Sequence, residues 1–432
     1  MKFNYLISIL FFTIINYCSF VNSIGIFKDI DIIYDHLKND IKEIFIDGIT
    51  PVNHVQYFIE TVNFNGYPCE HHSVTTEDGY ILGVFRIPYS YNENNSNNNN
   101  NNKTRQPILL QHGLLDSSIT WIVNNANQSL PFILSDMGYD VWMGNNRGNT
   151  YSINHTRLDV KSREFWEFSF DDMGWYDLPS MVDYIIDTTG VQEVGYVGHS
   201  EGTMQAWISY SEIKGFDKKV PIYIGLGPVG NVSHITNVAL KTMATYRVDD
   251  IFRIFGTKQF LPSPKLLRGL FISFCIDCPL CCEDVVEWLC GPHKGAFNQS
   301  RMPFVSGNEP GGTSLRNMVH FTQLVNSKRF QHYDYGVIGN LLHYGHEKPP
   351  LINVENIPPT VKIALFSGTK DELADTIDVK QLVSLLPQQS VLSWDIIESY
   401  AHLDYVWAID AHILIYPKIL NYFNDFFNQS QS

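Results

Sequence analysis

A serine flanked by glycines stands in Gly198-His199-Ser200-Glu201-Gly202, which fits the pattern Gly-x-Ser-x-Gly. Patterns of five residues occur by chance, so the neighbouring sequence decides what the motif means. An apolar run over 194–197 precedes it, and a helical pattern starts at Met204. A strand, a sharp turn and a helix are the setting in which a serine hydroxyl is exposed as a nucleophile, and glycines relieve the crowding of that turn. We therefore predict that Ser200 is a nucleophile at the carboxyl end of a sheet.

A serine nucleophile needs a base, and the base needs an acid. In this kind of fold the three follow in the order Ser, Asp or Glu, His. His402 lies between the β-type run 391–397 and a C-terminal helical pattern, and Asp371 follows the β-type run 361–366. We predict that His402 takes the proton of Ser200 and that Asp371 fixes the imidazole tautomer. The neighbouring acidic residues are instead expected to cap or begin the next helix; they are Glu372, Asp375 and Asp378.

The negative charge that develops on an attacked carbonyl oxygen needs two N–H donors. One should be the backbone N–H of Glu201, the residue after the nucleophile. The other should come from the loop Gln111-His112-Gly113-Leu114-Leu115 after an earlier strand, and we choose the N–H of Leu114. His112 is expected to pack under this loop and to take no part in catalysis.

Strands and helices alternate along the chain that must position these residues. The β-type runs cover 80–87, 108–111, 139–143, 194–197, 221–226, 361–366 and 391–397. Helical patterns cover 129–137, 175–188, 204–213, 379–386 and 411–427. Alternation of this kind predicts an α/β-hydrolase fold, with a mostly parallel central sheet and helices on both of its faces.

Four segments follow from this pattern. Residues 1–23 are predicted to be a signal peptide, because Lys2 precedes an apolar stretch and a small-residue cleavage site. Residues 24–226 and 360–432 form the two parts of the core, and residues 227–359, where the alternation stops, form a helical cap or lid. Within the first part, the Asn-rich stretch 92–102 is expected to be a solvated loop.

The predicted signal peptide and the sequons point to the secretory pathway, with a lysosomal or a secreted destination. A net charge of -15 and a pI near 5.4 exclude a basic nucleic-acid-binding protein. No apolar run is long enough to predict a transmembrane segment, and the oligomeric state stays open. Asn-x-Ser/Thr sequons predict glycosylation at Asn94, Asn102, Asn127, Asn154, Asn231, Asn298 and Asn428.

Five of the seven cysteines cluster in the predicted cap, namely Cys275, Cys278, Cys281, Cys282 and Cys290. In an oxidising lumen, dense cysteines indicate disulfides, and the spacing does not match a zinc site, so no metal is predicted. Five cysteines cannot all pair among themselves, so at least one is free or pairs elsewhere. The spacing leaves the pairing open.

The chain resembles the acid lipase family, which comprises gastric lipases, lysosomal acid lipase and their relatives that hydrolyse sterol esters. Matching segments run in order along nearly all of the chain after the signal peptide. They include Gly66-Tyr67-Pro68, Thr76 to Leu82, Gln111 to Ser118, Gly138 to Asn145, Arg147-Gly148-Asn149, Phe165 to Phe170, Tyr176 to Pro179, Gly312-Thr313-Ser314, His320, Asp371 to Asp375 and His402 to Tyr405.

The resemblance implies a lipase that hydrolyses triacylglycerols or sterol esters at a lipid–water interface, at acidic pH and without a cofactor. It implies the same triad, Ser200, Asp371 and His402, and a mobile lid. A general carboxylesterase or a lipid acyltransferase with this triad is the alternative. A peptidase and a non-catalytic binding protein built on the same fold are more remote ones.

Two departures from the family pattern matter. The family usually has Gln after the nucleophile, and Glu201 stands here, so we expect its side chain to be protonated or turned away from the oxyanion. The family typically has one cap disulfide and a lone cysteine, which Cys282 and Cys290 match. The resemblance leaves Cys275 or Cys278 as the partner of Cys282.

Overall fold

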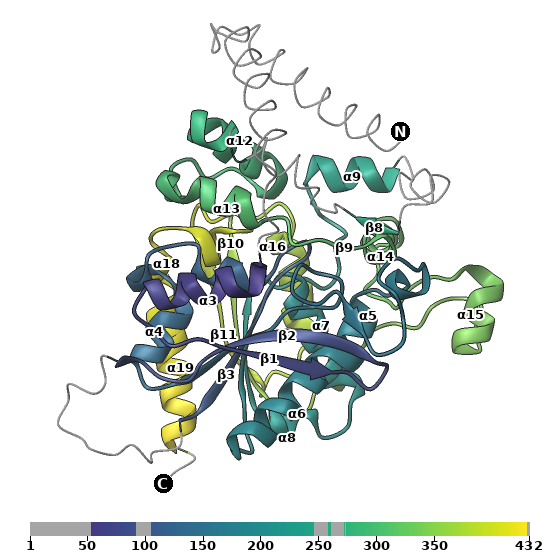
Figure 1. Ribbon diagram of the computed structural model, residues 1–432. Helices are drawn as coiled ribbons and strands as arrows, with labels where there is room; N and C mark the ends of the chain where they lie inside the picture. The colour runs from purple at the N-terminus through teal and green to yellow at the C-terminus, as the bar shows by residue number, and fades with distance from the viewer. Residues whose placement is uncertain (1–52, 92–104, 246–257, 261–271, 273, 430–432) are drawn as a thin grey trace, which may run out of the picture.

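The computed structural model describes residues 53–91, 105–245, 258–260, 272 and 274–429 (Figure 1). The predicted signal peptide and the Asn-rich stretch 92–102 lie outside the described residues. The same holds for the cysteine at position 18 and for the predicted glycosylation sites Asn94 and Asn102.

A twisted central sheet forms the core, in the order β1-β2-β4-β3-β6-β7-β10-β11, with β5 paired to β2. All neighbours from β4 to β11 are parallel, whereas β1, β2 and β4 pair antiparallel. The strands are β1 (Glu70–Thr75), β2 (Tyr80–Ile87), β3 (Pro107–Gln111), β4 (Asp140–Met143), β5 (Asn154–His155), β6 (Gly195–His199), β7 (Ile222–Leu226), β10 (Lys362–Gly368) and β11 (Val391–Ile397). The mostly parallel α/β sheet predicted from the sequence is confirmed.

Two strands of the central sheet, and the two-residue strands β8 (Gln259–Phe260) and β9 (Thr313–Ser314) outside it, were missed by sequence patterns. β1 has the sequence Glu-His-His-Ser-Val-Thr, of which only Val74 is buried, because the strand lies at the edge of the sheet. An edge strand does not need the continuous apolar run of a central one. β5 has two residues, which is too short to show an alternating hydrophobic pattern.

Alternate residues of the central strands contribute to two separate hydrophobic clusters. Ile108 and Leu110 of β3 pack into one cluster, and Leu109 packs into the other. Successive side chains of a strand point to opposite faces. The sheet is therefore buried on both sides, which explains why its central strands read as unbroken apolar runs.

Helices cover both faces of the sheet (Figure 1). Buried residues of α3 (His54–Phe64), α4 (Leu130–Asp136) and α19 (Tyr416–Gln429) belong to one cluster. Those of α6 (Leu178–Thr189), α7 (Glu201–Glu212) and α16 (Thr376–Leu385) belong to the other. The shorter helices of the core are α5 (Phe170–Asp172), α8 (Phe216–Lys219), α17 (Asp404–Trp407) and α18 (Ala411–Leu414).

Four predicted helices have different bounds in the structure. α16 starts at Thr376 and not at residue 379, because Asp375 caps its first turn. α7 starts at Glu201 and not at Met204, because the helix follows the serine turn directly. A π-helical turn over Met173–Asp177 precedes α6 where a continuous helix was expected. The helix predicted over 411–427 is divided into α18 and α19, because Pro417, near the start of α19, has no N–H to extend the preceding turn.

The segment between β7 and β10 is inserted between two strands that are neighbours in the sheet. It contains α9 (Val238–Thr245), β8 (Gln259–Phe260), α12 (Pro279–Cys290), α13 (Met302–Asn308), β9 (Thr313–Ser314), α14 (Leu315–Ser327) and α15 (Gly336–Tyr344). Its helices α9, α12 and α13 lie beyond one end of the sheet, at the top of Figure 1. That this segment is a separate cap over residues 227–359 stays a prediction.

Disulfides join Cys275 to Cys282 and Cys278 to Cys281, so the partner of Cys282 is Cys275. Among the described cysteines, Cys69 and Cys290 have free thiols. None of the helices in the described ranges has both the length and the apolar character needed to cross a bilayer.

Candidate functional site

Ser200 lies in a strained turn between β6 and α7. Its backbone has φ 53° and ψ -117°, outside the regions that a side chain normally allows, which costs about 1–3 kcal/mol. A Cβ at Gly202 would lie 2.7 Å from the carbonyl oxygen of Gln111, and one at Gly198 would lie 2.8 Å from that of Gly202. Both flanking glycines are therefore required for the close backbone approach that this turn makes.

Ser200, His402 and Asp371 form one hydrogen-bonded chain. Nε2 of His402 lies 2.7 Å from Oγ of Ser200, and Nδ1 of His402 lies 2.9 Å from both carboxylate oxygens of Asp371. Because the carboxylate accepts the proton of Nδ1, Nε2 is left free to accept that of the serine hydroxyl. All three side chains are buried, so water competes weakly for these contacts.

The carboxylate of Asp371 accepts several hydrogen bonds at the end of β10. The backbone N–H groups of Leu373 and Ala374 donate to Oδ1, at 3.0 and 2.7 Å, and the hydroxyl of Tyr405 donates to Oδ2 at 3.1 Å. Burial would raise the pKa of Asp371, but His402 and these backbone donors hold the pKa below its ordinary value. Asp371 is therefore an anion that can stabilise an imidazolium at His402.

The alternative acidic residues have other partners. Asp375 caps α16, with its side chain accepting a hydrogen bond from the N–H of Ile377 at 2.8 Å. Asp378 binds both the backbone N–H and the ring of His234, each at 2.7 Å. The backbone carbonyl of Glu372 accepts hydrogen bonds from residues 236 and 237. Asp371 is the acid of this stretch that contacts His402.

The loop that was expected to donate to an oxyanion packs directly on Ser200. A Cβ at Gly113 would lie 2.9 Å from Cβ of Ser200, so only glycine fits there. Leu114 is the next residue after Gly113, the glycine that packs against Ser200. Glu201 is the first residue of α7, where backbone N–H groups lack an intrahelical acceptor.

His112 is buried under this loop. Nδ1 lies 2.8 Å from the carbonyl oxygen of Gly113, and Nε2 accepts hydrogen bonds from the backbone N–H of Asn146 and the amide of Asn149, both at 3.1 Å. Burial lowers the pKa of His112 to about 4. The ring is therefore neutral and holds the loop in place.

The side chain of Glu201 points to the inserted segment. Its carboxyl group accepts hydrogen bonds from the amides of Asn146, at 3.3 Å, and of Asn317 in α14, at 2.5 Å. Burial raises the pKa of Glu201 to about 7, which the two amides partly oppose. The carboxyl group therefore contacts α14, and it is neutral at acidic pH.

Two neighbours of the triad were not predicted from the sequence. Nε2 of His199 donates a hydrogen bond to the backbone carbonyl of His402 at 2.8 Å, and Tyr405 binds Asp371. Burial lowers the pKa of His199 to about 3, so its ring is neutral. His199 is adjacent to Ser200, and Tyr405 lies three positions after His402. The partner of His199 follows β11, and the partner of Tyr405 follows β10. Adjacency to the motif was the only available signal.

The inserted segment also supports the loop that carries His402. The backbone N–H of His402 donates to the carbonyl of Cys290 at the end of α12, at 3.1 Å. Asp404 accepts from His293 at 2.6 Å and from the backbone N–H of Ala401 at 2.5 Å. The insertion therefore touches the same loop as the triad.

The predicted glycosylation sites differ in exposure. Asn127, Asn154 and Asn428 are exposed. Asn231 and Asn298 are half-buried, and Oδ1 of Asn298 accepts a hydrogen bond from the hydroxyl of Ser300 at 2.7 Å.

Two family models match the chain. One describes a partial alpha/beta-hydrolase lipase region over residues 58–125, and the other describes the alpha/beta hydrolase fold over residues 106–255. A carboxyl esterase from Bacillus coagulans, solved with glycerol, aligns with a TM-score of 0.51 at 12% identity. The alignment covers 83% of this chain and 98% of the esterase, and it supports the fold.

Curated relatives align at much higher identity. Lysosomal acid lipase/cholesteryl ester hydrolase of Homo sapiens is 39% identical over 372 residues, covering 84% of this chain and 89% of the relative. Gastric triacylglycerol lipase of Mus musculus is 40% identical over 367 residues, covering 84% and 90%. Lipase member J of Homo sapiens is 38% identical, covering 85% and 98%. The chain is therefore a serine ester hydrolase of the α/β-hydrolase fold and belongs to the acid lipase family.

Proposed function

We propose that the protein is a lipase that hydrolyses carboxylic ester bonds of neutral lipids, through an acyl-enzyme formed on Ser200. The observation that carries this proposal is the chain of hydrogen bonds from Asp371 through His402 to Ser200. Nδ1 of His402 lies 2.9 Å from Oδ1 of Asp371, and Nε2 of His402 lies 2.7 Å from Oγ of Ser200. A serine, an imidazole and an oriented carboxylate at these distances are the parts needed for acyl transfer.

In the first half of the reaction, Oγ of Ser200 attacks the ester carbonyl and passes its proton to Nε2 of His402. His402 then gives that proton to the departing alcohol, and the acyl group stays on Ser200. In the second half, His402 takes a proton from water, the hydroxide attacks the acyl carbonyl, and the proton returns to Oγ as the fatty acid leaves. The carboxylate of Asp371 stabilises the imidazolium in both halves.

The backbone N–H groups of Leu114 and Glu201 are the proposed oxyanion donors. Support comes from the contact of Gly113 with Ser200 and from the position of Glu201 at the start of α7. Neutral donors aimed at a developing charge usually supply the largest part of the catalysis.

The substrate class rests on relatives whose names include cholesteryl ester hydrolase and triacylglycerol lipase. We therefore propose triacylglycerols and sterol esters, taken at a lipid–water interface. Acidic working pH is consistent with Glu201, which is neutral below a pKa of about 7. The predicted signal peptide and the lysosomal and gastric relatives support a place in the secretory pathway, in the lysosome or outside the cell.

The test compares wild type with Ser200→Ala on a long-chain triacylglycerol and a cholesteryl ester, from about pH 4 to about pH 8. We expect fatty acid release that is greatest in acid and falls at least about a thousandfold in the variant. Cleavage restricted to short soluble esters would favour a general carboxylesterase. Transfer of the acyl group to an added alcohol would favour an acyltransferase. Unchanged release by Ser200→Ala would contradict the proposal.

A further inference from the structure

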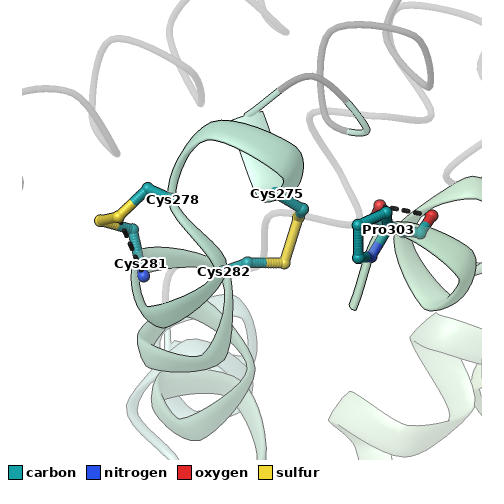
Figure 2. Close-up of a disulfide and its surroundings, with 6 residues drawn as sticks. Cys275, Cys278, Cys281, Cys282 and Pro303 are labelled. Atoms are coloured by element: carbon teal, nitrogen blue, oxygen red, sulfur yellow. Dashed lines mark hydrogen bonds between the residues drawn. A yellow bond between two sulfur atoms is a disulfide. The ribbon is translucent and has the colours of Figure 1, made fainter. Parts of the chain in front are cut away.

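Two nested disulfides stand at the start of α12 in the inserted segment (Figure 2). The outer one joins Cys275 to Cys282, and both of these residues are at most 1% exposed. The inner one joins Cys278 to Cys281, and both of these are half-buried. The two disulfides therefore differ in their access to solvent.

The inner disulfide adds little to the stability of the fold. A cross-link stabilises mainly by restricting the unfolded chain, and its effect grows with the length of chain that it closes. Cys278 and Cys281 are three positions apart, inside a segment that Cys275 and Cys282, seven positions apart, already close. The outer disulfide therefore supplies most of the stabilisation, and the inner disulfide adds little to it.

The chemical setting of the inner disulfide favours exchange. Cys278-Pro279-Leu280-Cys281 has Cys-x-x-Cys spacing, and Cys278 is the N-cap of α12. The backbone N–H of Cys281 donates to Sγ of Cys278 at 3.3 Å, drawn as a dashed line in Figure 2. A helix N-terminus and this donor both stabilise a thiolate. The adjacent Asp277 is exposed, where water and salt screen its charge.

We propose that the Cys278–Cys281 disulfide is a reversible thiol–disulfide exchange site for low-molecular-weight thiols and dithiols. An incoming thiolate attacks Sγ of Cys281, forms a mixed disulfide with it and releases Cys278 as a thiolate at the helix N-terminus. The second thiolate of a dithiol then attacks the reagent's own sulfur in that mixed disulfide and releases Cys281. Two electrons pass from the dithiol to the protein, the dithiol becomes a cyclic disulfide, and its two protons end on Cys278 and Cys281.

The site is separate from the hydrolase chemistry. The opposite end of α12 supplies the carbonyl of Cys290 to the N–H of His402. Because the Cys275–Cys282 disulfide keeps the start of α12 in place, ester hydrolysis should stay within about twofold when only the inner disulfide is open.

The experiment treats the folded full chain with increasing dithiothreitol, quenches with iodoacetamide and locates the alkylated cysteines by peptide mass spectrometry. We expect alkylation of Cys278 and Cys281 at dithiol concentrations at least about tenfold below those that open Cys275–Cys282. Glutathione disulfide should then close the inner pair again. Simultaneous opening of both disulfides, or earlier opening of the outer one, would overturn the proposal.

Variants separate exchange from stability. Cys278→Ser with Cys281→Ser should change Tm by less than about 2 °C, whereas Cys275→Ser with Cys282→Ser should lower Tm by a larger amount. In Cys281→Ser, the thiol of Cys278 should react with iodoacetamide about tenfold faster than the thiol of Cys281 does in Cys278→Ser. Peptide mapping verifies that Cys275–Cys282 is intact in both single variants. Equal rates would remove the helix terminus as the cause and overturn the proposal.

Discussion

At the scale of single residues, the acid of the proposed triad is held by a hydroxyl that no sequence pattern identified. The hydroxyl of Tyr405 donates to Oδ2 of Asp371 at 3.1 Å and so fixes the carboxylate against His402. We regard Tyr405 as a positioning residue, because it reaches the serine only through Asp371 and His402.

Replacing Tyr405 with Phe should lower kcat about tenfold and leave KM unchanged, because a hydrogen bond to a charged group contributes about 1.5 kcal/mol. Hydrolysis of a soluble short-chain ester measures both constants. Tyr416→Phe is the matched control, since its hydroxyl donates to the backbone carbonyl of Tyr405 and not to the acid. If Tyr416→Phe loses as much kcat as Tyr405→Phe, the effect comes from packing and not from the contact with Asp371.

Glu201→Gln should broaden the pH profile toward neutral pH. The pKa of Glu201 is raised to about 7, so a carboxylate forms beside the proposed oxyanion donor as the pH rises through that value. Gln keeps both amide contacts possible and stays neutral. The measurement is kcat/KM from about pH 5 to about pH 8.5, where the variant should retain activity that wild type loses. Superimposable profiles for the two proteins would rule out this role for Glu201.

At the scale of elements, a half-buried chain of ion pairs joins the insertion to the core. His332, after α14, lies 3.1 Å from Asp171 in α5 and 2.9 Å from Glu212 at the end of α7. Burial would lower the pKa of His332, but hydrogen bonds to these two carboxylates raise it to about 10. The ring is therefore a cation that joins the segment after α14 to the helices α5 and α7 across the boundary of the insertion.

His332→Gln should lower the free energy of unfolding by about 2 kcal/mol, because two half-buried carboxylates lose their cation. The pKa of His332 is raised in the fold, so its contribution is complete below about pH 6.5 and is lost as the pH rises through about 10. Urea denaturation at about pH 6 measures the difference. Lys219→Gln, which breaks an exposed pair with Asp183, should change stability by about 0.5 kcal/mol or less. A loss no larger than that of the control would contradict the prediction.

At the scale of the whole molecule, buried carboxyl groups with raised pKa values gather at the junction of core and insertion. Asp116 and Glu309 form a buried pair between the loop after β3 and the insertion, where Gly311 also donates to the carbonyl of Leu115 at 2.7 Å. Burial raises the pKa of Asp116 to about 6, and burial with the charge of Asp116 raises the pKa of Glu309 well above its ordinary value. Together with Glu201, they favour protonation at the junction of core and insertion.

The free energy of unfolding should therefore fall as the pH rises from about 6.5 to about 8. A group whose pKa is higher in the folded than in the unfolded protein stabilises the fold fully below its unfolded pKa. That stabilisation is lost as the pH rises through its folded pKa. The predicted range starts at about pH 6.5 because His112 and His199 have lowered pKa values in the fold. Below about pH 6.5, these two residues make the free energy of unfolding rise with pH and so oppose the effect of the carboxyl groups. Calorimetry at several pH values measures the slope. Glu201→Gln combined with Glu309→Gln should make the slope smaller, with His332 contributing to what remains. An unaltered slope would assign the pH dependence to other groups.

The sequence by itself determined the local structure of this protein and the order of its candidate site residues. The motif around Ser200, the predicted strands and the order of the candidate serine, acid and base all came from short patterns. Such patterns report local structure, because a central strand must be apolar on both faces and a nucleophile turn must have glycines. The ends of the predicted strands lie within two residues of the observed ones for the same reason.

Only the tertiary structure decided the contacts between distant segments. The pairing of Cys282 with Cys275, the contact of Glu201 with Asn317 and the hydrogen bond of His199 to His402 join residues that no short pattern relates. Each depends on how helices pack across the sheet and its insertion. The sequence thus limits which side chains are available for chemistry, and packing decides which of them meet, because burial and distance are properties of the whole fold.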